Sequence, residues 1–147
     1  MKRSIIIIIF VLISLTLLAE DIVMPIIIDY TGDDNVGGRL VYELKEGIKK
    51  SESMSLSLID ELGIRISIIT INSDRNNPGN KTIYSIAWLW NTPGKPFPYY
   101  LTSTVGFCGS QRVSETAQGL VADTYEQSEK MLKLLINMIQ ELNKNNE

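Results

Sequence analysis

Residues 26–60 read IIIDYTGDDNVGGRLVYELKEGIKKSESMSLSLID, and this stretch decides the fold class. The continuous apolar run from Ile22 to Asp29 is typical of a strand that is buried on both faces. After a polar turn, apolar residues recur every four positions and predict a helix that starts at Val36 and ends at Lys49-Lys50. Alternating serine and apolar residues then predict a strand over 54–59, so helices and strands share one fold.

The rest of the chain predicts three more strands and one long helix. The strands are expected at 64–71, 82–90 and 99–107, and the short loops between neighbouring strands favour an antiparallel meander. A helix is expected from an N-cap at Ser110 to about Leu142, a length of roughly 48 Å at 1.5 Å per residue. A domain of this size is narrower than that, so we expect a bend near Asp123-Thr124 or a second half that leaves the body. The predicted class is α+β, with a mainly antiparallel sheet of about five strands packed by two helices.

The first nineteen residues have the order of a secretory signal peptide. Lys2 and Arg3 precede an apolar run from Ile5 to Leu18, and Ala19 stands before two acidic residues. The run is shorter than the roughly 20 residues that a membrane-spanning helix needs, which favours cleavage after Ala19. We therefore expect a signal peptide at 1–19, a single domain at 20–147 and a periplasmic or secreted location. Contact with the membrane is expected only through the signal peptide, if it is not cleaved.

Composition excludes several classes of function. The chain has 14 Lys+Arg, 17 Asp+Glu and no histidine, and its net charge of −3 becomes −5 without Lys2 and Arg3. An acidic domain without a basic stripe argues against binding to nucleic acid or to an anionic membrane surface. Without histidine, the chain cannot form a Ser-His-Asp triad, a Cys-His dyad or a histidine-containing zinc site. No cofactor is expected.

Acidic residues and glycines gather in the loop after the first strand. Residues 32–39, GDDNVGGR, place glycines at both ends of a strand-to-helix loop, but they lack the lysine and hydroxyl that a phosphate-binding loop needs. We interpret them as a capped helix start at which Gly37-Gly38 lets a neighbour pack closely. An alternative is an Asp/Glu-based hydrolase or metal-binding enzyme. It predicts a concave pocket that holds at least two of four carboxylates: Asp29, Asp33, Asp34 and Glu43.

The single cysteine, Cys108, lies in the sequence Gly106-Phe107-Cys108-Gly109-Ser110. This setting resembles that of a nucleophile at a strand-to-helix junction, but the chain has neither a histidine base nor a second cysteine. A small buried side chain is therefore the expected role, with intermolecular pairing as the other alternative.

Aromatic residues are concentrated between Tyr84 and Phe107. In the strand predicted at 82–90, three of them lie with Ile86 on one face because alternate residues share a face: Tyr84, Trp88 and Trp90. Either this face is exposed and binds a partner, or the proline loop and the long C-terminal helix cover it. Burial is the expected alternative, and Tyr84, Trp88 and Trp90 are the candidate partner-binding residues if it is exposed.

The quoted stretch 26–60 resembles the N-terminal domain of TolB, the periplasmic partner protein of the Tol-Pal system. Residues 112–127, RVSETAQGLVADTYEQ, are similar to the helix that closes that domain, and CsgG-type secretion proteins contain a related α/β domain. The order of NPGN (77–80), the tryptophan strand, PFPYYLTSTVGFCG (96–109) and the closing helix is also similar to that of small exported bacterial proteins without assigned function. The resemblance implies a non-enzymatic envelope module that acts by docking, and it transfers no site residues.

The sequence therefore predicts a periplasmic binding or assembly module that acts through protein-protein contacts. Its partner is expected to be an envelope protein, or a second copy that associates through residues 131–142. In that segment, apolar residues cover an arc of about 200° at 100° per residue, which is more than one packing face needs.

Overall fold

The computed structural model describes residues 23–73 and 79–144, which form one sheet and two helices. In chain order the elements are β1 Met24–Thr31, α2 Asn35–Lys49, β2 Met54–Ser57, β3 Gly63–Asn72, β4 Lys81–Asn91, β5 Tyr99–Gly109 and α3 Val113–Lys144. The predicted α+β class, with about five strands and two helices, is confirmed. The predicted signal peptide at 1–19 lies outside the described residues.

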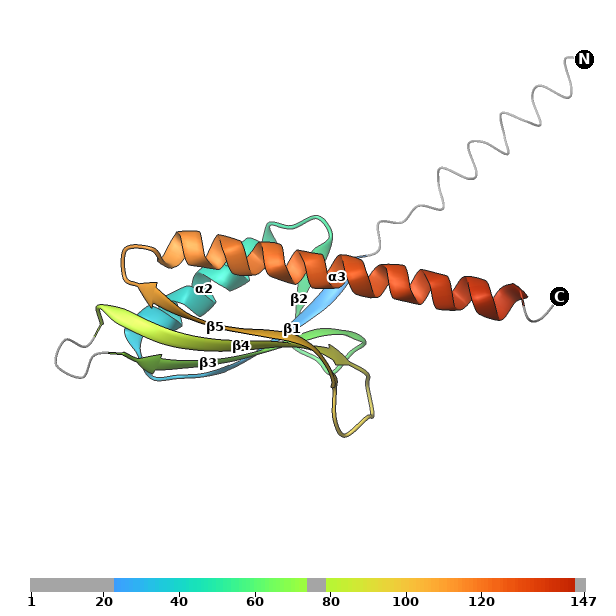
Figure 1. Ribbon diagram of the computed structural model, residues 1–147, viewed down its shortest axis with the longest axis horizontal. Coiled ribbons are helices and arrows are strands. Elements are labelled where there is room, and N and C mark those ends of the chain that lie inside the picture. Colours follow the sequence, from blue (N-terminus) through green and yellow to red (C-terminus); the bar gives the residue numbers. More distant parts are fainter. Residues whose placement is uncertain (1–22, 74–78, 145–147) are drawn as a thin grey trace, which may run out of the picture.

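The sheet has the strand order β2-β1-β3-β4-β5 (Figure 1). β3, β4 and β5 form the expected antiparallel meander, whereas β1 pairs in parallel with both β2 and β3. The meander is therefore wrong for β2, which lies on the far side of β1 instead of beside β3. The reason is the helix between β1 and β2, because a strand-helix-strand connection brings the second strand back in the direction of the first.

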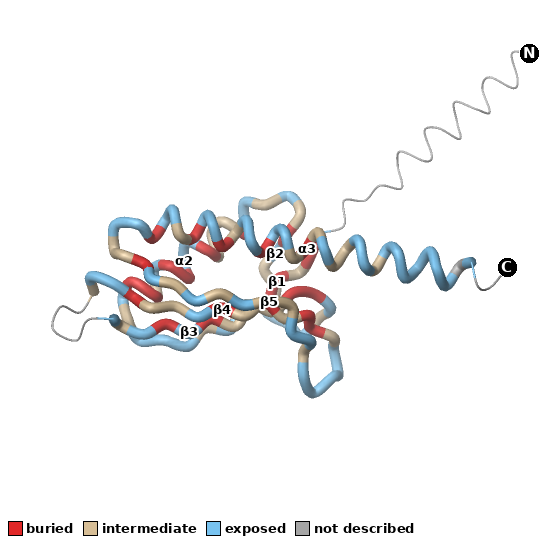
Figure 2. Tube along the Cα trace, viewed as in Figure 1, coloured by how far each residue is buried: buried red, intermediate tan, exposed pale blue. Residues whose placement is uncertain are grey.

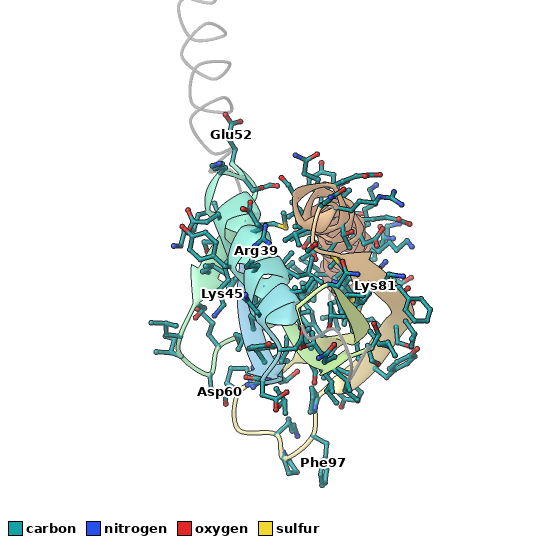
Figure 3. The ribbon with its side chains drawn as sticks, turned by 90° about the vertical axis from the view of Figure 1, so that its left-hand side faces the viewer. Arg39, Lys45, Glu52, Asp60, Lys81 and Phe97 are labelled. Carbon is teal, nitrogen blue, oxygen red and sulfur yellow. The ribbon has the colours of Figure 1, made fainter. Side chains whose placement is uncertain are left out.

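Both helices pack on the same face of the sheet, as the end view in Figure 3 shows. Side chains alternate along each strand, so Ile64, Ile66 and Ile68 of β3 point toward the helices and are buried. On the helix side these residues meet the apolar stripe of α2, which contains Leu40 and Leu44. The opposite face of the sheet, called the outer face below, has no helix over it in the described residues.

Helix α3 runs without interruption over 32 residues, starting three residues after the predicted N-cap Ser110. Its first half packs on the sheet and α2, and its second half continues past the end of the sheet, where most residues are exposed (Figure 2). The predicted bend near Asp123-Thr124 is wrong, and the alternative of a second half that leaves the body is confirmed. No proline occurs in α3 and its one glycine is Gly119, so the sequence after Leu120 contains no residue that interrupts a helix.

A buried hydrogen bond fixes α3 over the middle of the sheet. The indole Nε1 of Trp88 donates to the hydroxyl of Thr124 over 2.9 Å, and that hydroxyl donates to the carbonyl of Leu120 over 2.7 Å. One turn later the hydroxyl of Ser128 donates to the carbonyl of Thr124 over 2.9 Å. Trp88, Thr124 and Ser128 are all buried. The indole N–H is the only polar group of Trp88, the largest side chain of the core, and its hydrogen bond requires Thr124 to stay at this position of α3.

Replacing this threonine tests the anchor. We expect Thr124→Val to lower the free energy of unfolding by about 1–3 kcal/mol, because the indole N–H of Trp88 loses its buried acceptor while the volume of the side chain is kept. Urea unfolding of Thr124→Val, Trp88→Phe and the double variant gives the coupling energy between the two residues. Ser128→Ala is the control, since it leaves no donor unpaired and should cost less. Independent, additive effects of the two substitutions would contradict the anchor.

Candidate functional site

The aromatic residues of β4 divide into two groups. Trp88 is 2% exposed and Trp90 is 8% exposed, and both belong to the core beneath the helices. The expected burial of this face is confirmed for the two tryptophans. Trp88 and Trp90 are therefore core residues in this fold, and not the partner-binding residues that the other alternative required. Tyr84 differs, because it is half-buried and lines an open groove.

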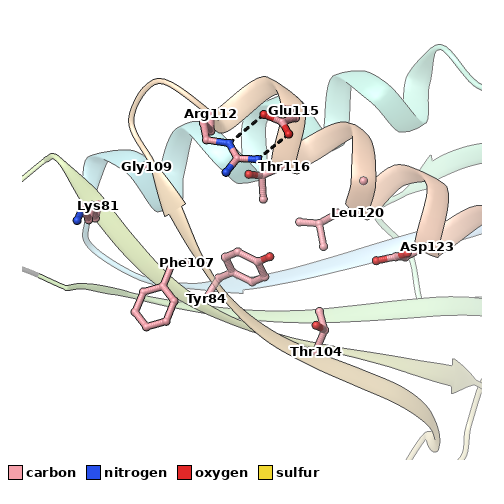
Figure 4. A pocket seen from close by; sticks show the side chains of 11 residues that line it. Lys81, Tyr84, Thr104, Phe107, Gly109, Arg112, Glu115, Thr116, Leu120 and Asp123 are labelled. Atoms are coloured by element: carbon pink, nitrogen blue, oxygen red, sulfur yellow. Dashed lines mark hydrogen bonds and ion pairs between the residues drawn. The ribbon is translucent and has the colours of Figure 1, made fainter.

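This groove lies between α3 and the strands β4 and β5, and its volume is about 610 Å³ (Figure 4). The Tyr84 ring lies on its floor beneath Leu120, and burial raises the pKa of the Tyr84 hydroxyl. Lys81 and Arg112 line it at one end and Asp123 at the other. Arg112 is held by Glu115 through bonds of 2.6 and 2.9 Å, whereas Lys81 and Asp123 form no ion pair within the described residues.

The loop after β1 is a helix cap. Asp34 accepts the backbone N–H of Gly37 through Oδ1 over 2.6 Å and the hydroxyl of Thr82 through Oδ2 over 3.1 Å. Both carboxylate oxygens of Asp34 therefore stabilise the start of α2 and tie it to β4. The capped helix start predicted for residues 32–39 is confirmed.

The four carboxylates of the enzyme alternative do not meet at one place. Asp33 and Asp34 line one cavity of about 390 Å³ together with Asn35, Asn72 and Gly79. The enzyme alternative requires at least two of the four carboxylates in one pocket, and this pair meets that requirement. Asp29 instead lies on the outer face, where Arg65 Nη1 donates to it over 2.7 Å. Glu43 lines a separate cavity between α2 and α3. Within residues 23–73 and 79–144, no group of three histidine, cysteine or acidic residues is close enough to hold a metal ion.

The two glycines at the start of α2 differ in their surroundings. At Gly37 a Cβ atom would overlap the side chain of Thr70 and lie 2.6 Å from Asp34 Oδ2, whereas at Gly38 no atom lies within 4 Å. The predicted close packing is therefore confirmed at Gly37 and wrong at Gly38.

Alanine at these two positions should act in opposite directions. We expect Gly37→Ala to destabilise the domain by about 1–3 kcal/mol, because Thr70 and the capping carboxylate must move. Gly38→Ala should stabilise it by about 0.5–1 kcal/mol, since alanine is favoured over glycine within a helix and its methyl group would meet no neighbouring side chain. Thermal unfolding of the two matched variants measures both changes, and equal shifts would refute the difference in packing.

Cys108 is buried, with 1% of its surface exposed, near the end of β5. Its thiol donates a weak bond of 3.5 Å to the carbonyl of Gly109. The expected role as a small buried side chain is confirmed.

The outer face of the sheet carries apolar residues that the sequence reasoning did not single out. They lie on β3 and β5 and are about half or more exposed: Ile69, Ile71, Val105 and Phe107. The sequence does show that β3 has apolar residues on both of its faces, which could have indicated a second apolar surface. It does not show which of the two faces the helices leave uncovered.

Two loops at one end of the sheet are held together by Arg65. Its guanidinium binds Asp29 and, over 3.2 Å, Asp60 of the β2–β3 loop, while the Asn91 amide donates to the same Asp60 oxygen over 2.7 Å. The Asn91 amide, followed by the backbone of Gly94 and the charge of Arg65, lowers the pKa of Asp60. This network positions the β4–β5 loop, on which Phe97 points away from the body (Figure 3).

The end of α3 beyond Leu135, residues 136–144, forms an arm that extends past the sheet (Figure 1). Leu135, still in contact with the core, begins an i, i+3, i+4, i+7 series that continues through three exposed residues: Met138, Ile139 and Leu142. At 100° per residue these four lie within about 60° of the direction of Leu120, Thr124 and Ser128, which face the body. One stripe of α3 is therefore buried in the first half of the helix and open in the arm.

No protein-family model matches the chain, and no curated protein matches it. Among solved structures, a candidate lipoprotein from Caulobacter crescentus CB15 aligns with a TM-score of 0.40 and 12% identity over 67% of this chain and 86% of that chain. A minor lipoprotein from Acinetobacter baumannii aligns with a TM-score of 0.39 and 7% identity over 71% of this chain and 92% of that chain. The resemblance to the TolB N-terminal domain stays a prediction.

Neither helix in the described part of the chain has the length and apolar character that crossing a membrane requires.

Proposed function

We propose that the chain is an exported, non-enzymatic module of the bacterial envelope that acts by docking other proteins. The observation that carries this proposal is the arm of α3, whose apolar stripe continues the stripe by which α3 packs on its own body. Exposed fractions of 54% at Met138, 56% at Ile139 and 63% at Leu142 leave this stripe without a partner within the described residues. Such a stripe on a protein surface is typical of an interaction site.

The spacing of these residues suits one mode of recognition. An amphipathic helix that binds an apolar groove uses anchors at i, i+3, i+4 and i+7, and Leu135, Met138, Ile139 and Leu142 have this spacing. The side of the arm away from the stripe carries charged residues that keep the free arm in water, among them Lys133, Glu141 and Lys144. The proposed partner therefore presents an apolar groove, or a helix with a complementary stripe.

The expected export supports a partner in the envelope. The order of cationic, apolar and small residues before Glu20 is that of a cleavable signal peptide. A folded domain follows it, because the described residues, 23–73 and 79–144, bury a continuous core in which Cys108 is unpaired.

Processing of the chain tests the expected export. Mass spectrometry of the chain recovered from the periplasm or the medium should give the mass of residues 20–147. Ala19→Arg should block the cleavage and leave the uncut chain in the membrane fraction, because the residue before the cut must be small. Recovery of the uncut chain from the cytosol would refute the expected export.

A photoreactive side chain tests docking by the arm. With p-benzoylphenylalanine in place of Met138, irradiation of cells that produce the chain should give one adduct of discrete mass. The matched control carries the same residue in place of Asn137, which points about 100° away from Met138 and outside the stripe, and should give little adduct. Met138→Lys and Leu142→Lys should weaken capture of the crosslinked partner by at least about tenfold, since each charge would enter an apolar contact.

The mass of the adduct identifies the kind of partner. Twice the mass of the chain means self-association through the arm, and any other mass means a different envelope protein. Equal adducts at Met138 and Asn137, or none at either position, would contradict docking through the stripe.

A further inference from the structure

Strand β5 is a long, unprotected edge of the sheet. It pairs with β4 on one side, and the strand order ends there, whereas the opposite edge strand β2 has only four residues. The 11 residues of β5, YYLTSTVGFCG, include no charge and no proline. Natural edge strands usually carry such residues because the unpaired backbone N–H and C=O groups otherwise bind another strand. The one irregularity, a register shift beside Leu89, leaves residues 102–109 regularly paired with β4.

We propose that β5 pairs in the antiparallel direction with β5 of a second copy, with the twofold axis at Gly106. This register places Val105 of each copy opposite Phe107 of the other copy. Both residues lie on the outer face and are 70% and 72% exposed in the single chain. Pairs of an aromatic and a β-branched residue directly opposite each other stabilise antiparallel strands, and the twofold axis forms this pair twice.

The surroundings of Gly106 leave room for the second strand. On the helix side the Tyr84 ring fills the place that a side chain at 106 would take, since a Cβ atom there would lie 2.6 Å from Tyr84 Cζ. The groove separates α3 from this edge, so the helix does not cover it. In a twofold pair the partner strand is β5 itself, which carries no charged residue. Neither strand then buries a charge without a counter-charge, whereas a strand with acidic or basic residues would find no opposite charge along β5.

This proposal does not depend on the arm. The arm leaves the sheet at one end, whereas β5 forms its lateral edge, so substitutions can remove either contact separately (Figure 1). The experiment uses the exported chain with Met138→Lys and Leu142→Lys, which excludes association through the arm.

Light scattering and sedimentation over micromolar to millimolar concentrations measure the mass of this chain and its charge variants. We expect a dimer. Val105→Lys with Phe107→Lys places like charges opposite each other twice and should weaken dimerisation by at least about tenfold. Val105→Glu with Phe107→Lys places opposite charges in the same two positions and should restore the dimer at low salt. Ile69→Lys with Ile71→Lys adds two charges to the outer face on β3, two strands from the edge, and should leave the mass unchanged.

Three results would overturn the proposal: a monomer at all concentrations, a dimer that survives the two lysines, or a folded Glu-Lys variant that stays monomeric. Circular dichroism confirms that each variant is folded. If a charge variant unfolds, mixing a Val105→Cys chain with a Phe107→Cys chain decides the question. The proposed register predicts a disulfide between the two different chains, and the absence of that disulfide under oxidising conditions refutes it.

Discussion

The hydrogen bond from Trp88 to Thr124 is the interaction on which the rest of the structure depends. The Trp88 side chain is the largest in the core, and its single polar group has one acceptor, on α3. A partner one position along the helix would turn the hydroxyl by about 100° and leave the indole N–H unpaired in the core. The bond therefore fixes both the rotation of α3 and its position along the sheet.

This fixed position divides the apolar stripe of α3 into two parts. The residues up to Ser128 are buried on the body, and Leu135 is the last residue of the stripe that contacts the core. Everything beyond it extends past the sheet because the helix is longer than the surface that supports it. The same core thus explains why the tryptophans are unavailable to a partner and why the arm is available.

The sequence predicted the local features well. The limits of α2 followed from apolar spacing and from a capping aspartate, Asp34, all within about 15 residues of one another. The pairing of β2 with β1 was missed, because it depends on the path of the helix between them and not on the residues of β2. The sequence favoured burial of the Trp88 face of β4 without deciding it, since Ile83, Ala87 and Leu89 make the other face apolar as well.

The candidate surfaces were predictable to different degrees. The arm could be predicted from the sequence because too many apolar residues occupy one helix end. The edge of β5 could not, since its place at the end of the sheet follows from the strand order alone. Tyr84 lies on the aromatic face as expected, but at the margin of that face, where it lines the groove and is half-buried.

Amide hydrogen exchange along α3 in the dilute, monomeric chain tests most directly that Trp88 and Thr124 hold one half of the helix and release the other. Strong protection is expected from about Thr116 to Leu132, with protection falling by orders of magnitude between Leu135 and Leu142. Uniform protection from end to end would show that the arm packs on its own body, and uniformly fast exchange would show that the Trp88 anchor does not hold. Either result would contradict the account.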